Sequence, residues 1–148
     1  MLRQYLVGAA ASVCNIAIHA LVMVSVINVT RVADELVTKY QTFRLVAVMI
    51  AAVTVLMIAH LAEVLVWSLT YAIFGVAPDG ADIVYFAFVN YTTLGYGDVT
   101  PVVRWHLLGP MTAMNGVLLF GWSTAVLFEV LRMTLLVSGE GEKPGWSK

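Results

Sequence analysis

Long apolar stretches separated by short polar segments dominate the chain. Three are long enough to cross a bilayer, because a hydrocarbon core about 30 Å thick needs roughly 20 apolar residues per helix. They run from Tyr5 to Val29, from Leu45 to about Val76 and from about Trp105 to Val137. A shorter apolar patch, Ile83 to Tyr91, cannot cross the bilayer as a helix. We expect this patch to enter the membrane and turn back, or to lie at the interface.

The composition agrees with this pattern. Of the 148 residues, 61% are hydrophobic and only 11% are charged, which is more apolar than a soluble domain of this size can bury. The chain is therefore predicted to be an all-α integral membrane protein with three transmembrane helices and a re-entrant helix. A net charge of -1 without a basic cluster argues against nucleic-acid binding. The single cysteine, Cys14, cannot form an internal disulfide, and we expect it to pack as a small apolar residue.

The polar segments divide the chain into four parts. We predict an N-terminal transmembrane helix at residues 1–30, a linker at residues 31–44, a larger membrane domain at residues 45–137 and a mobile cytoplasmic tail at residues 138–148. Met1-Leu2-Arg3 followed by an apolar run resembles the start of a signal peptide. The run is longer than the apolar core of a signal peptide, and no clear cleavage site follows it. We therefore predict a retained span. The linker is either an amphipathic surface helix or a helical extension of a neighbouring span.

Basic residues predict the orientation in the membrane. The first linker and the C-terminal region are richer in them than the opposite side, so both are predicted to be cytoplasmic and the N-terminus outside. The residues compared are Arg31, Lys39, Arg44, Arg132, Lys143 and Lys148 on the cytoplasmic side, against Arg3 and Arg104 on the other side.

A turn and a short helix precede the most informative segment. Pro78, Asp79 and Gly80 are typical of a turn, and Asp82 is suited to capping a helix over residues 82–92. The C-terminal carbonyls of that helix would point into the membrane, where their partial negative charge attracts a cation.

Glycines at alternate positions follow this helix, in the sequence Thr93-Leu94-Gly95-Tyr96-Gly97-Asp98. Glycine permits backbone conformations that other residues avoid, so successive carbonyls can all face one axis. Four copies around that axis would form rings of oxygen atoms that replace the water around an ion. One chain alone cannot do this, and a homotetramer is therefore expected.

This segment resembles the pore signature of potassium channels. The resemblance covers about Leu45 to Val137, with an outer helix at 45–76, a pore helix at 82–92, a filter at 93–97 and an inner helix at 105–137. It is similar to compact bacterial members of the family and implies a bacterial inner or plasma membrane. It also implies that Asp98 anchors the outer mouth and that K+ binds at Thr93, Leu94, Gly95, Tyr96 and Gly97.

Two filter positions bear on selectivity. Leu94 departs from the family's usual valine, whereas Tyr96 retains the aromatic residue that accompanies potassium selectivity in the family. A non-selective cation channel and an accessory or transporter-like subunit therefore stay open as alternatives. An enzyme is not expected, because the soluble parts bring together no nucleophile, base and orienting acid.

Polar residues inside the predicted spans suggest further roles. His60 and Glu63 lie on one helix face and predict either a proton-sensitive gate or a structural clamp. His19 and Asn15 also share a face and are expected to join helices. No cluster of zinc ligands is expected from the sequence. Trp67, Tyr71 and Trp105 are expected at the membrane interface or in helix packing, and Trp122 also lies in a predicted span.

The inner helix contains two further candidates. In the resembling channels a glycine midway along this helix is a gating hinge, and Gly116 lies nearest to that place, while Gly121 would suit close helix packing with Ala125. Glu129 and Arg132 predict a local ion pair, or a ring of Glu129 carboxylates at the inner mouth. No cofactor is expected besides the permeant K+. The gating stimulus, and any gating partner or ligand, stay open.

Overall fold

The computed structural model describes residues 1–35 and 41–139, and this part of the chain is helical with no strand. The helices, in chain order, are α1 (Leu2–Glu35), α2 (Gln41–Phe74), α3 (Ile83–Tyr91), the 3₁₀ turn η1 (Val103–Trp105) and α4 (Leu108–Gly139).

Three segments are long and apolar enough to span a bilayer. They are Leu2–Asn28, Thr42–Phe74 and Val103–Leu136, with mean hydropathies of 2.1, 2.6 and 1.5. Their outward surfaces carry apolar side chains such as Leu6 and Ile50, as expected for helices in lipid. The predicted fold class, an all-α membrane protein with three transmembrane helices, is confirmed.

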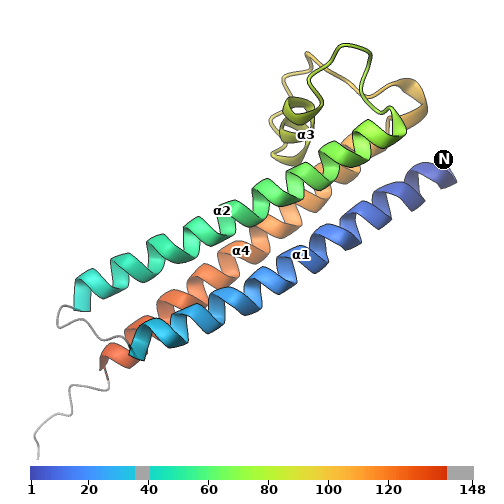
Figure 1. Cartoon of the computed structure of the whole chain (residues 1–148). Coiled ribbons are helices and arrows are strands. Elements are labelled where there is room, and N and C mark those ends of the chain that lie inside the picture. Colours follow the sequence, from blue (N-terminus) through green and yellow to red (C-terminus); the bar gives the residue numbers. More distant parts are fainter. Residues whose placement is uncertain (36–40, 140–148) are drawn as a thin grey trace, which may run out of the picture.

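The three long helices pack against one another, and α3 packs against α2 and α4 at one end of this bundle. Figure 1 shows the N-terminus at the same end as α3. There the backbone N–H of Leu107 donates a hydrogen bond of 2.9 Å to the side-chain oxygen of Gln4. The start of α1 is thereby joined to the start of α4.

Local sequence explains where the helices begin and end. α2 ends at Phe74 because Gly75 has a φ of 60°, and the Val76 N–H then bonds the Tyr71 carbonyl at 3.0 Å. α4 accepts Pro110 in its first turn, where the missing N–H removes no intrahelical bond. The outer helix therefore ends two residues before the expected residue 76, and α4 begins three residues after the expected residue 105.

The predicted linker is helical where the structure describes it. α1 continues to Glu35 and α2 already begins at Gln41, so both flanks of the linker extend the spans. Residues 36–40 of the linker and residues 140–148 of the predicted tail lie outside the described residues.

Two apolar clusters fill the interior, and buried polar residues lie along the bundle between them. The cluster nearer α3 contains Trp67 and Tyr71, both fully buried, together with Trp105, so these aromatic residues serve helix packing. The second cluster joins α1, α2 and α4 farther from α3 and includes Met23, Val26, Val48, Ala52, Leu56, Val126 and Val130. The expectation that Cys14 is packed is wrong, because its side chain is exposed on α1.

Candidate functional site

The short helix α3 is fixed at its N-terminal end by a side-chain cap. Asp82 has an extended backbone, and its carboxylate accepts a hydrogen bond of 3.0 Å from the Tyr85 N–H. This arrangement satisfies one of the free N–H groups of the first turn and places a negative charge at the positive end of the helix. The predicted cap is confirmed, and α3 ends at Tyr91, shortly before the loop of residues 93–97.

The backbone of that loop, residues 93–97, alternates in handedness. Thr93, Gly95 and Gly97 have φ angles of 61°, 62° and 79°, in the left-handed region, while Leu94 and Tyr96 do not. Such alternation turns successive carbonyl groups towards the same side of the chain, unlike the alternating directions of an ordinary strand. Thr93 adopts this conformation although it is not glycine, which is uncommon for a β-branched residue and marks a constrained site.

Backbone hydrogen bonds attach the start of the loop to α3. The N–H of Leu94 donates to the Val89 carbonyl at 3.0 Å, and the N–H of Thr93 donates to the Asn90 carbonyl at 3.1 Å. Residues 93–97 are nevertheless exposed, with Leu94 51% and Tyr96 69% accessible. At membrane depth such a loop must line a cavity or meet other protein.

A hydrogen bond joins the far end of the loop to α3. The Tyr85 hydroxyl donates to the Asp98 carboxylate at 2.8 Å. This hydrogen bond raises the pKa of Tyr85, because ionisation would remove the donated proton and place a phenolate beside a carboxylate. Asp98, expected at the outer mouth, thus lies against α3.

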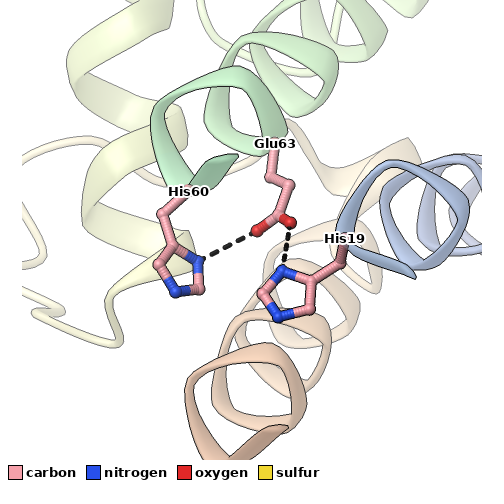
Figure 2. Close-up of side chains that lie close together, drawn as sticks. All are labelled: His19, His60 and Glu63. Carbon is pink, nitrogen blue, oxygen red and sulfur yellow. Dashed lines mark hydrogen bonds and ion pairs between the residues drawn. The ribbon is translucent and has the colours of Figure 1, made fainter. Parts of the chain in front are cut away.

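A second set of polar side chains lies inside the bundle. Figure 2 shows His19 from α1 and His60 and Glu63 from α2 facing one another. The Nδ1 atom of His19 lies 2.7 Å from one Glu63 oxygen, and the Nδ1 atom of His60 lies 3.0 Å from the other. His19 and Glu63 are fully buried.

Two further residues complete this arrangement. The Tyr91 hydroxyl, at the end of α3, donates a hydrogen bond to Glu63. The Ser123 hydroxyl of α4 lies 3.0 Å from Nε2 of His60 and 3.3 Å from Nε2 of His19. His19, His60, Glu63, Tyr91 and Ser123, here named the polar cluster, therefore join α1, α2, α3 and α4.

A neighbouring group of amides strengthens the same junction. The Asn15 amide donates to the Glu63 backbone carbonyl at 3.2 Å and to the Asn115 side-chain oxygen at 3.0 Å. The Trp67 indole donates to the same Asn115 oxygen at 3.0 Å. The expectation that Asn15 and His19 join helices is confirmed.

The expectation that the chain has no cluster of zinc-type ligands is wrong. His19, His60 and Glu63 each offer a ligand atom, and these atoms lie within 4.8 Å of one another. His60 and Glu63 could be paired from their spacing, but His19 is 44 residues from Glu63. Only the packing of α1 against α2 brings them together. One feature of the sequence indicates this contact. Asn15 and His19, four residues apart, form a polar face on an otherwise apolar helix, and such a face is expected to contact polar residues of another helix.

The two glycines of α4 lie in different surroundings. A Cβ atom at Gly116 would overlap the carbonyl oxygen of Tyr91, whereas a Cβ at Gly121 would meet no atom within 4 Å. Gly116 therefore permits the close approach of α4 to the end of α3, and its role as a gating hinge stays a prediction. The close helix approach expected at Gly121 and Ala125 is not formed at Gly121 among the described residues.

At the far end of α4, Glu129 and Arg132 form a local ion pair. The guanidinium of Arg132 bonds both carboxylate oxygens of Glu129, at 2.7 and 2.8 Å. This is the simpler of the two interpretations of these residues, and the ring of Glu129 carboxylates stays a prediction.

Two spanning helices, a short capped helix between them and a loop of alternating handedness define a pore-loop membrane protein. A family model described as "Ion channel" matches residues 45–133, from α2 through α3 and the loop into α4. The chain therefore belongs to this ion channel family. The match leaves α1 outside. Searches of curated proteins and of solved structures gave no match to the chain.

Proposed function

We propose that this chain is one subunit of a homotetrameric, potassium-selective channel that conducts K+ passively. The filter would be residues 93–97, with backbone carbonyls and the Thr93 hydroxyl as ligands. Four chains would surround each ion, replace its water and pass ions between adjacent sites by mutual repulsion. The function involves no covalent chemistry.

The alternating backbone of residues 93–97 carries this proposal. Left-handed φ angles at three alternate residues give one chain a row of carbonyls on one side, at the C-terminal end of a capped helix. The exposure of Leu94 and Tyr96 supports burial by other subunits rather than by this chain. The uncovered apolar face of α4, with Met114, Val117 and Leu118, supports the same assembly.

The proposed orientation follows the basic residues. The N-terminus, the start of α4 and the loop lie at one end of the bundle, which we assign to the outside of a plasma membrane. The C-terminal end of α4, with the Glu129 and Arg132 pair, would then face the cytoplasm.

The decisive measurement is the reversal potential of purified protein in planar bilayers, with K+ on one side and Na+ on the other. We expect a value close to the K+ equilibrium potential, and we expect Gly95→Ala to abolish the current. Alanine is strained at the φ of 62° found there, so the carbonyls of the filter loop would turn away from the axis.

Gly80→Ala is the matched control. Gly80 also has a left-handed φ, 81°, and open space around its Cβ position, but it lies in the turn before α3. It should bear similar backbone strain and keep its selectivity. A reversal potential near zero with substantial current would contradict potassium selectivity, and an absence of current would favour an accessory subunit.

A further inference from the structure

The two histidine rings of the polar cluster have polar contacts on both sides. On one side, the Nδ1 atoms of His19 and His60 lie 2.7 and 3.0 Å from the two different oxygens of Glu63. On the other side, their Nε2 atoms lie 3.3 and 3.0 Å from the single hydroxyl of Ser123. The Tyr91 hydroxyl contacts Glu63 and also lies 2.9 Å from Nδ1 of His60.

A neutral histidine carries one ring hydrogen, so each ring can donate on only one of these sides. With hydrogen on both Nδ1 atoms, two Nε2 lone pairs face Ser123, which has one proton. With hydrogen on Nε2 of His60 alone, its Nδ1 and a Glu63 oxygen are two acceptors that share the Tyr91 proton. With hydrogen on Nε2 of His19 alone, its Nδ1 faces a Glu63 oxygen with no hydrogen between them. Each of these arrangements leaves one contact between two acceptors.

The fourth arrangement places hydrogen on Nε2 of both rings. Both Nε2–H groups then donate to Ser123, whose oxygen has two lone pairs and can accept both. The two free Nδ1 lone pairs are left facing the two oxygens of Glu63. Two imidazole nitrogens and two carboxylate oxygens that face one another are a set of metal ligands. Figure 2 shows these atoms turned towards one another between α1 and α2.

The size of this site suits a small metal ion. His19, His60 and Glu63 each offer one ligand atom, and these three atoms lie within 4.8 Å of one another. Ligands about 2.1 Å from a tetrahedral ion lie about 3.4 Å apart. The N–O separations of 2.7 and 3.0 Å therefore have to open by less than about 1 Å to admit the ion. Small rotations of three side chains supply a change of this size.

The chemistry of the site identifies the class of ion. Imidazole nitrogens bind first-row transition metals such as Zn²⁺, whereas Mg²⁺ and Ca²⁺ prefer sites made of oxygen alone. Glu63 is fully buried, and among the described residues its carboxylate pairs with no lysine or arginine. A cation beside it would supply the opposite charge that a buried carboxylate needs.

We infer that His19, His60 and Glu63 bind one divalent transition-metal ion of the Zn²⁺ type, which fastens α1 to α2. Ser123 accepts hydrogen bonds from both ligating rings, and Tyr91 donates one to the ligating carboxylate. Such supporting hydrogen bonds orient metal ligands and are usual at metal sites. α1 lies outside the residues that match the ion channel family, so the ion joins this additional helix to the channel domain.

Elemental analysis of the full chain tests the site directly. The protein is purified in detergent without a metal-affinity column, incubated with Zn²⁺ and dialysed against metal-free buffer. We expect about one Zn²⁺ per chain, and at least about a tenfold weaker affinity in His19→Gln and in Glu63→Gln. His106→Gln is the matched control, because this histidine is exposed, and it should keep the wild-type content. No retained Zn²⁺, or its loss in His106→Gln alone, would overturn the inference.

X-ray absorption at the zinc edge decides the question even if the His19 and Glu63 variants do not assemble. It needs only the His106→Gln chain, in which His19 and His60 are the remaining histidines. We expect nitrogen and oxygen neighbours about 2.0–2.2 Å from the ion, with scattering from the carbon atoms of two imidazole rings. A spectrum with fewer than two imidazole rings would overturn the inference.

Ser123→Ala tests which ring nitrogens bind the ion. It removes the acceptor of both Nε2–H groups, so Zn²⁺ affinity should fall about 10–100-fold while saturating Zn²⁺ still gives about one ion per chain. Ser25→Ala, at an exposed position on α1, should keep the wild-type affinity. Equal affinities in the two variants would overturn coordination through both Nδ1 atoms. All of these readouts measure metal binding, so a chain that binds Zn²⁺ and carries no K+ current would reject the proposed function and retain the metal site.

Discussion

The polar cluster and the proposed filter, residues 93–97 and here named the filter loop, lie on either side of Tyr91. They differ in how complete they are within one chain. The polar cluster draws on four helices and is almost fully buried. The filter loop is exposed and aligns its backbone towards a side that this chain does not cover. Under the proposed function, polar contacts between helices are completed within one subunit, whereas ion coordination would require the other subunits of the assembly.

Gly116→Ala should have the largest effect on stability and ion flux, because Gly116 contacts Tyr91, which lies between the filter loop and the polar cluster. Its Cβ would overlap the Tyr91 carbonyl, which is backbone and cannot rotate away. We expect a loss of about 1–3 kcal/mol in stability, as for other overpacked sites, and strongly reduced K+ flux. Thermal unfolding of the purified assembly and flux into vesicles measure the two effects.

Gly121→Ala is the matched control in the same helix, since no atom lies within 4 Å of its Cβ position. It should leave stability and flux almost unchanged. Normal opening and stability of Gly116→Ala would argue against both the close contact and a hinge at this glycine.

Tyr91→Phe should have an intermediate effect that is specific to the polar cluster. It removes the hydroxyl that donates to Glu63 and keeps the ring that packs against Phe120. Nδ1 of His60 still faces the same Glu63 oxygen, so the loss should be that of one hydrogen bond, about 0.5–1.5 kcal/mol. Chemical or thermal unfolding would show the loss, and Tyr5→Phe, an exposed position on α1, should show none. Equal stability of the two variants would mean that the cluster does not depend on Tyr91.

The smallest effect should come from Tyr85 at the exposed end of the loop. The bond to Asp98 raises the pKa of Tyr85 above its ordinary value of about 10. The neutral phenol is therefore favoured in the folded protein. Its stabilising contribution is complete below about pH 10 and is lost as the pH rises through the raised pKa.

Ultraviolet titration of tyrosinate measures this shift, with Tyr85 identified by difference from Tyr85→Phe. Asp98→Asn keeps an acceptor oxygen but removes the charge, and the Tyr85 titration should move back towards about pH 10. An unchanged titration would show that Asp98 does not influence the phenol.

The fold was largely predictable because it depends on properties that are local in sequence. Long apolar runs define α1, α2 and α4, and the cap at Asp82 and the alternate glycines define α3 and the loop. The end of α2 and the start of α4 were predicted less accurately. They depend on the left-handed backbone of Gly75 and on the place of Pro110 in the first turn of α4.

The polar cluster was only half predictable. His60 and Glu63 are three apart on one helix, so their pairing follows from helical geometry. His19, Tyr91 and Ser123 join them only through packing between helices, and no local spacing encodes those contacts. The contact of Gly116 with Tyr91 is likewise a result of tertiary approach.

The pairing of His19 with Glu63 also has a consequence for how the chain is made. An acidic residue near the middle of a transmembrane segment costs roughly 2.5–3.5 kcal/mol during insertion. α1 precedes α2 in synthesis, so His19 and Asn15 are already in the bilayer when α2 arrives. α1 then offers the Glu63 carboxylate a hydrogen-bonding partner inside the bilayer, so we expect the insertion of α2 to cost less free energy than it would without α1.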